Sequence, residues 1–130
     1  RIEPLLVTLA APLLTAAEID HLDRLASEME EADDVETFLR LDREFHLSSY
    51  VPAQTVVLGE LVTGLWNRTQ HYRRAFTRVF RSEGDRSAHL EHHLIVSALR
   101  RGDAEEVASI LTTHIRRTRI ELARHPDIFD

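Results

Sequence analysis

The stretch RSAHLEHHLIVSALRRGDAEEVASILTTHIRRTRIELAR, residues 86–124, decides the fold class. Apolar residues such as Ile95 and Leu99 recur along it at spacings of three and four, a period typical of amphipathic helices. Gly102 ends the first helical half, and Asp103 caps the second half. The stretch therefore predicts two helices that are joined by a tight turn and pack side by side in opposite directions.

The same helical period extends over the preceding residues. Thr15-Ala16-Ala17-Glu18 is a capping box, in which Thr accepts from backbone N–H groups and Glu reaches back. Asp33-Asp34-Val35-Glu36 has the same form and places acids at the positive end of another helix. Residues 1–12 predict a first helix whose apolar face consists of Ile2, Leu5, Leu6 and Leu9.

A long fourth helix is expected between Pro52 and about Phe80. Pro is tolerated in a first turn, and Gly59 and Gly64 weaken this helix and permit a bend. Ser82-Glu83-Gly84-Asp85 is typical of a loop. No long run alternates between apolar and polar residues, as strands require. The prediction is an all-α fold, an antiparallel helical bundle that forms a single domain over residues 1–130.

The composition excludes several classes of protein. The chain has no cysteine, which rules out disulfides and thiolate zinc sites. Its net charge of −6 leaves no basic stripe for DNA, so any DNA contact requires another segment. No apolar run approaches the roughly 18 to 20 residues of a membrane span, and Arg1-Ile2-Glu3-Pro4 is not a secretory signal. We expect a cytoplasmic domain without membrane contact, cut from a longer chain.

Asp42 and His46 form the first candidate pair for chemistry. They are four residues apart, so a helix places both side chains on one face, next to Leu41 and Phe45. The alternative interpretation of this pair is an ordinary exposed contact that stabilises the helix by a few tenths of a kcal/mol.

His92 and His114 form a second pair, because the midpoint of their positions is residue 103, in the predicted turn. On antiparallel helices both therefore lie at the same height, roughly 16 Å from the turn, and can face each other. A matched pair of this kind can also be a structural contact. Three imidazoles and one carboxylate together suit a divalent metal, with zinc favoured and nickel, manganese or iron as alternatives.

Two further groups of residues are ambiguous. His89 precedes His92 by three residues and could approach the same site. The polar segment 66–74 either lines a cavity, with an arginine that holds a carboxylate, or is a solvated face with Trp66 and Tyr72 in the core.

Several segments in this order resemble the C-terminal ligand-binding domain of FadR-type regulators in the GntR family, the FCD domain. Arg1-Ile2-Glu3-Pro4-Leu5 is similar to its first helix, and Asp42-Arg43-Glu44-Phe45-His46 to its Asp-x-x-Phe-His motif. Glu91-His92-His93-Leu94-Ile95 resembles its Glu-His-x-x-Ile helix, and His114 falls where its last helix supplies a histidine. Ser48–Pro52 departs from the Gly-Asn that often follows the Asp-x-x-Phe-His helix.

The resemblance implies a fold, a ligand set and partners. The fold is an antiparallel bundle of six to seven helices, and the metal ligands are Asp42, His46, His92 and His114. The effector is a small carboxylate, which we expect Arg73, Arg74 or His89 to contact. The resemblance further implies a homodimer that contacts DNA only through an N-terminal winged helix-turn-helix domain outside this chain.

A regulator of this kind is not an enzyme, but three alternatives fit the same residues, one of which is a purely structural bundle in which the histidines are incidental. The His/Asp site could belong to a metal-dependent enzyme acting on a small organic acid, with Glu91 or His89 as general base. The domain could also bind an acyl or other ligand without metal, as some members of the resembled family do.

Overall fold

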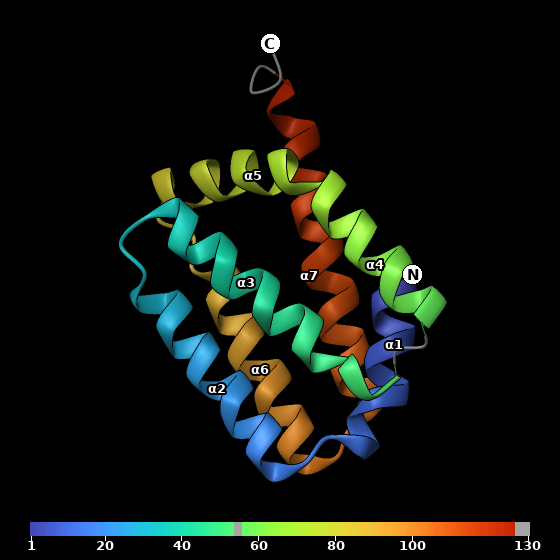
Figure 1. Ribbon diagram of the computed structural model, residues 1–130. Helices are drawn as coiled ribbons and strands as arrows, with labels where there is room; N and C mark the ends of the chain where they lie inside the picture. Colours follow the sequence, from blue (N-terminus) through green and yellow to red (C-terminus); the bar gives the residue numbers. More distant parts are fainter. Residues whose placement is uncertain (54–55, 127–130) are drawn as a thin grey trace.

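The structure is a computed structural model that describes residues 1–53 and 56–126, and the regular elements in this part are all helical (Figure 1). The prediction of an all-α fold with six to seven helices is confirmed. The short 3₁₀ segments are η1 (Ala11–Leu13) and η2 (Val51–Ala53). The α-helices of the described residues are α1 (Ile2–Ala10), α2 (Ala16–Glu31), α3 (Val35–Ser49), α4 (Val56–Arg68), α5 (Gln70–Ser82), α6 (Ser87–Arg101) and α7 (Ala104–Arg124).

The predicted helix ends are confirmed at Thr15 and Gly102, whereas the N-cap of α3 is Asp34 rather than Asp33, and Glu36 pairs with Arg74. Thr15 and Glu18 form the complete capping box of α2. At the start of α3, Asp34 accepts a hydrogen bond of 2.8 Å from the Thr37 backbone N–H. Gly102 ends α6 in the left-handed conformation, with φ of +71°, which glycine adopts without steric cost.

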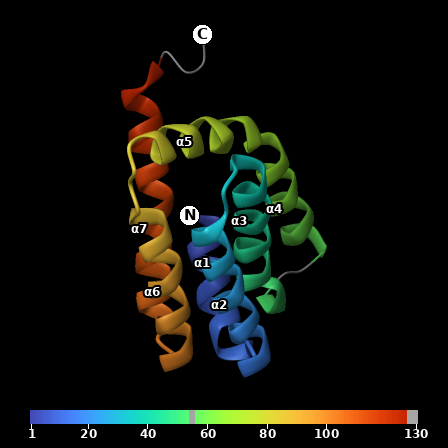
Figure 2. The ribbon, with the colours of Figure 1, turned by 90° about the vertical axis from the view of Figure 1, so that its left-hand side faces the viewer.

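Two helical hairpins form the body of the bundle. α2 packs against α3 and α6 against α7, while α2 also contacts α6 and α1 lies along α7 (Figure 1). Figure 2 shows α5 crossing the ends of this bundle, where it contacts α3 and α7. One hydrophobic cluster lies between α2, α3, α6 and α7, and a smaller one joins Leu6 and Ala10 to Tyr50, Val62 and Trp66.

The single long helix predicted from Pro52 to Phe80 is wrong. Pro52 lies in η2, residues 54–55 fall outside the described residues, and the remainder divides into α4 and α5 at Thr69. Thr69 has φ −97° and ψ 4°, and its hydroxyl donates to the Leu65 carbonyl at 2.9 Å, a back-bond that often bends helices. The break therefore falls at Thr69 rather than at Gly59 or Gly64, and it turns α5 across the bundle (Figure 2).

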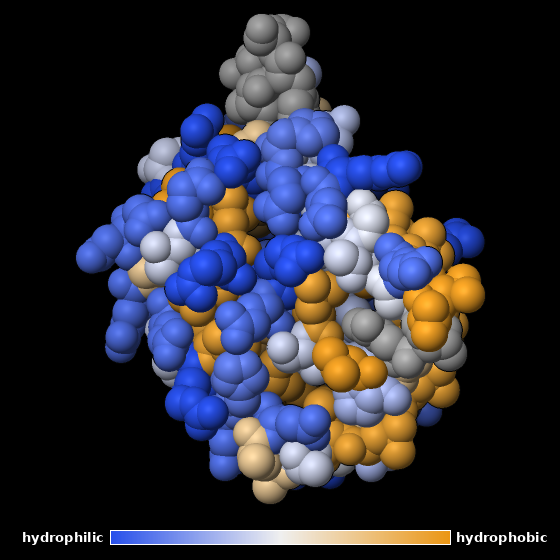
Figure 3. All heavy atoms as spheres, viewed as in Figure 1, coloured by the Kyte–Doolittle hydropathy of each residue, from blue (hydrophilic) through white to orange (hydrophobic). Residues whose placement is uncertain are grey.

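The predicted inner face of the first helix is also partly wrong. Leu6 is buried, but Leu5 and Leu9 are 60% and 53% exposed, and Val7 and Ala10 take the inner positions. Nearly every residue of this helix is apolar, so the period alone does not select one face. Exposed apolar side chains also gather on α4, at Val56, Val57, Leu61 and Leu65, where Figure 3 shows hydrophobic spheres beside a largely polar surface.

Candidate metal centre

α3 brings Asp42 and His46 into the interior together. Phe38, Leu41 and Phe45 anchor the inner face of α3 in the large hydrophobic cluster, and the helical spacing turns Asp42 and His46 in the same direction. The two residues are only 6% and 2% exposed. This burial contradicts the alternative interpretation of an exposed surface pair.

α6 and α7 supply the other two histidines, as the midpoint of their positions predicted. His92 is fully buried, and its ring centroid lies 4.8 Å from that of His114. The His114 ring also lies 5.2 Å from that of His46, so α7 and α3 meet at this point. Two hairpins that are far apart in sequence therefore deliver their polar side chains to one place.

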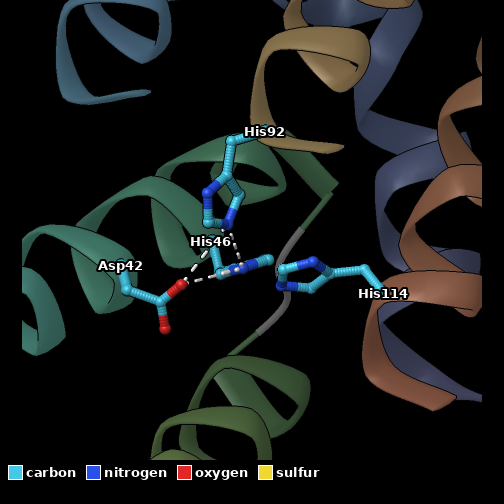
Figure 4. Close-up of side chains that lie close together, drawn as sticks. All are labelled: Asp42, His46, His92 and His114. Atoms are coloured by element: carbon cyan, nitrogen blue, oxygen red, sulfur yellow. Dashed lines mark hydrogen bonds and ion pairs between the residues drawn. The ribbon is translucent and has the colours of Figure 1, made fainter. Parts of the chain in front are cut away.

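The four side chains converge on a small volume (Figure 4). The Nε2 atoms of His46 and His92 lie 3.3 Å apart, and each lies 3.4 Å from Asp42 Oδ1. With His114 included, one ligand atom from each residue lies within 4.8 Å of all the others. Atoms bound about 2.0–2.2 Å from a tetrahedral zinc stand roughly 3.3–3.6 Å apart. The spacing among Asp42, His46 and His92 matches such an ion, and the 4.8 Å limit with His114 included is wider.

The ionisation states also suit a metal. Burial alone would raise the pKa of Asp42, but the charges and hydrogen bonds of His46 and His92 outweigh it and hold that pKa well below its usual range. Burial lowers the pKa of His92 and of His114 despite their carboxylate neighbours. A carboxylate and neutral imidazoles are the protonation states that bind metal ions.

Glu91 fixes the orientation of His114. One Glu91 carboxylate oxygen lies 2.8 Å from His114 Nδ1, and the other lies 2.6 Å from Arg117 Nη2. A hydrogen bond at Nδ1 leaves Nε2 of His114 as its metal-binding nitrogen. Glu91 was expected as part of the Glu-His-x-x-Ile motif and as a candidate general base, and its contacts with His114 and Arg117 were not predicted.

The structure separates the two candidate arginines. Arg73 Nη1 lies 3.8 Å from Asp42 Oδ2, and the guanidinium stacks 3.2 Å from the centre of the Trp66 ring. Arg74 points to Glu36, with which it makes two hydrogen bonds of 2.8 and 2.9 Å at the exposed surface. Only Arg73 therefore lies beside the four-residue cluster.

Trp66 stacks on the Arg73 guanidinium and is itself hydrogen-bonded to Tyr50. The Trp66 indole N–H donates to the Tyr50 hydroxyl at 3.1 Å, and that hydroxyl donates to Glu3 Oε2 at 3.4 Å. Burial raises the pKa of Tyr50, which keeps this hydroxyl protonated. In the polar segment 66–74, Trp66 is thus in the core, whereas Tyr72 is 43% exposed.

His89 lies apart from the cluster. It is buried on α6, where its ring packs against Phe38 at 5.7 Å and Phe80 at 5.2 Å between centroids. Burial lowers the pKa of His89. The structure thus gives His89 an aromatic environment and does not bring it together with the four candidate ligands.

A cavity leads from the surface to the cluster. It has a volume of about 210 Å³, and its wall includes His46 and His114 from the candidate metal centre. Arg73, Thr118 and Arg119 also line it. A small ligand in this cavity would meet the imidazoles of His46 and His114 and the guanidinium groups of Arg73 and Arg119.

Comparison with known proteins agrees with this arrangement. The model of the FCD domain family matches residues 1–117. The fold is similar to that of E. coli McbR/YncC, with a TM-score of 0.85 and 23% identity over 95% of this chain. The chain spans 63% of the length of that structure. A search of curated protein sequences gave no match.

No helix in the described residues is long and apolar enough to cross a membrane. Because the family model covers all four candidate ligands and most of the seven-helix bundle, the chain belongs to the FCD domain family.

Proposed function

We propose that this domain senses a small carboxylate effector for a transcription regulator, with a divalent metal held by Asp42, His46, His92 and His114. Three imidazoles and one carboxylate suit zinc, nickel, manganese and iron. Zinc is the ion we favour, and the other three are alternatives. The observation that carries the proposal is the convergence of these four donors at a cavity that a small ligand can enter. A bound divalent cation would supply a Lewis-acidic centre, and a coordination number above four would leave positions open to carboxylate oxygens.

The chain's own residues bind and orient the effector. Arg73 lies at the cavity wall and already pairs loosely with Asp42, so its guanidinium is placed to donate hydrogen bonds to a carboxylate. Stacking on Trp66 restricts the position of the guanidinium. Glu91 keeps His114 in one orientation through its Nδ1 contact.

The effector would act on DNA binding through a segment outside these residues. The chain carries a net charge of −6, so operator contact would fall to an N-terminal DNA-binding domain outside it. The proposed regulator is a cytoplasmic homodimer. Regulation requires that the effector bind two states of the dimer with different affinity, and coupling on the order of 1–3 kcal/mol is typical. An effector that binds the full-length protein yet leaves its operator affinity unchanged would contradict this part.

Metal content is the first test. Protein purified without a nickel column is analysed by mass spectrometry, and the wild type is compared with the His92→Ala/His114→Ala double variant. We expect about one metal ion per chain in the wild type and none in the variant. A wild-type protein that takes up no metal after incubation with zinc or manganese would refute the metal-anchored function.

Effector binding is tested with the same protein. Thermal shift with lactate and citrate is compared between Arg73→Met and Arg74→Met. We expect the shift to disappear only in Arg73→Met, because Arg74 is engaged with Glu36 at the surface. Equal loss in both variants would contradict the assignment of Arg73.

A further inference from the structure

Arginines without a partner gather around the mouth of the effector cavity. Arg119, on α7, lines the same cavity as His46 and His114 and also an adjoining cavity of about 530 Å³. Arg1 and Arg116 line the adjoining cavity with it. Arg1, Arg116 and Arg119 make no ion pair with any residue in the described ranges 1–53 and 56–126.

Several other arginines of the described residues pair with acids, whereas Arg24, Arg68 and Arg78, which line neither cavity, make no ion pair either. Arg74 contacts Glu36, Arg100 contacts Asp20 and Asp23, and Arg117 contacts Glu91. Positive charge is in excess where the cavities open, although the whole chain carries −6.

One acid opposes the arginines at these openings. Glu3 lines the 210 Å³ cavity, and its carboxylate accepts a hydrogen bond from Tyr50. A surplus of guanidinium groups remains, and it selects an anion with more than one charge.

His114 and Arg119 both line the cavity from α7, five residues apart, which is about 7.5 Å along a helix. Ile115 and Leu122 form apolar wall between and beyond them. A volume of about 210 Å³ is below the 300–1,000 Å³ typical of drug-sized ligands, so the ligand is short.

We propose that the effector is a short dicarboxylate, with one carboxylate at His46 and His114 and the second paired with Arg119. This inference rests on the proposed effector-sensing function and adds to it the class of ligand. The methylene groups of such a ligand would lie against Ile115 and Leu122.

Calorimetry on the zinc-loaded protein tests the proposal. Succinate, glutarate and adipate are compared with butyrate, pentanoate and hexanoate, which have the same lengths but one charge. All titrations are run at one ionic strength, since salt screens charges at a cavity mouth. We expect the best dicarboxylate to bind at least about tenfold more tightly than its monocarboxylate, because it adds a charge-assisted hydrogen bond.

Arg119→Gln should abolish that preference by lowering the dicarboxylate affinity much more than the monocarboxylate affinity. The matched control is Arg124→Gln, an exposed arginine of the same helix that pairs with Glu121 outside this cavity, and it should retain the preference. Unchanged circular dichroism and melting temperature establish that both variants fold.

The failures are distinguishable. Equal binding of both ligand series, or a dicarboxylate preference that survives Arg119→Gln, overturns the dicarboxylate assignment and leaves the effector-sensing function standing. Absence of binding by either series to zinc-loaded protein overturns both proposals.

Discussion

Replacing Glu91 with glutamine should weaken metal binding without removing a ligand. The wild-type carboxylate accepts from His114 Nδ1 at 2.8 Å and from Arg117 Nη2 at 2.6 Å, and its side chain is only 10% exposed. Glutamine has the same shape but only one accepting oxygen. If that oxygen serves His114, the amide NH₂ faces the donating Arg117, and the reverse arrangement places it against His114.

The expected magnitude follows from this mismatch. Loss of a partner that orients a metal-binding histidine commonly costs 10- to 100-fold in affinity, which is about 1.4–2.7 kcal/mol. Since either orientation of the amide leaves two donors face to face in a poorly solvated place, we expect the upper half of this range.

Competition for Zn²⁺ with a chromophoric chelator at pH 7.5 measures the effect directly. The matched control is Glu106→Gln, which removes the same charge from an exposed pair with Arg101 at the start of α7 and should keep wild-type affinity. A Kd for Glu91→Gln within twofold of wild type would refute the positioning role. A similar loss in Glu106→Gln would show that general charge, rather than the His114 contact, controls affinity.

Trp66 is the only tryptophan, and its ring centroid lies 5.4 Å from that of His46. Nickel binding should therefore quench the Trp66 fluorescence, with saturation at one equivalent of nickel per chain. Quenching that persists in the His92→Ala/His114→Ala double variant would place the metal elsewhere. Gly102→Ala should lower the free energy of unfolding by about 1 kcal/mol, because φ is +71° there. Gly64→Ala, at an uncrowded helical position, should raise it by about 0.5–1 kcal/mol. Urea unfolding measures both changes, and changes of the same sign would contradict the backbone argument. Since burial lowers the folded-state pKa of His92, the unfolded chain takes up a proton first, and metal-free protein should lose stability as pH falls below about 6.5; urea midpoints that stay flat from pH 8 to pH 5 would argue against this.

Much of the site was predictable because it depends on helical registry. Four-residue spacing fixed the relation of Asp42 to His46, and the turn at Gly102 fixed the relation of His92 to His114. The same midpoint argument applies to Glu91 and His114, whose positions also centre on this turn, so the Glu91 contact left a signal in the sequence.

Other features depend on tertiary packing. Arg73 and Arg74 are neighbours about 100° apart on a helix, and only the direction of α5 decides which of them faces Asp42. That direction is set by the break at Thr69, which has no glycine or proline to mark it. The buried face of α1 was ambiguous for a different reason, because apolar residues of α1 itself lie on almost every side of the helix.

The stacked pair of Arg73 and Trp66 connects the wall of the cavity to the first turn of α1. From the guanidinium, contact passes through the indole to the Tyr50 hydroxyl and from there to Glu3, in the first turn of α1. Three side chains therefore span the distance between a bound ligand and the beginning of the first helix. Any shift of Arg73 that alters its stacking on Trp66 changes the surroundings of that turn, so occupancy of the cavity would reach α1 through this chain of contacts as well as through Glu3 in the cavity wall.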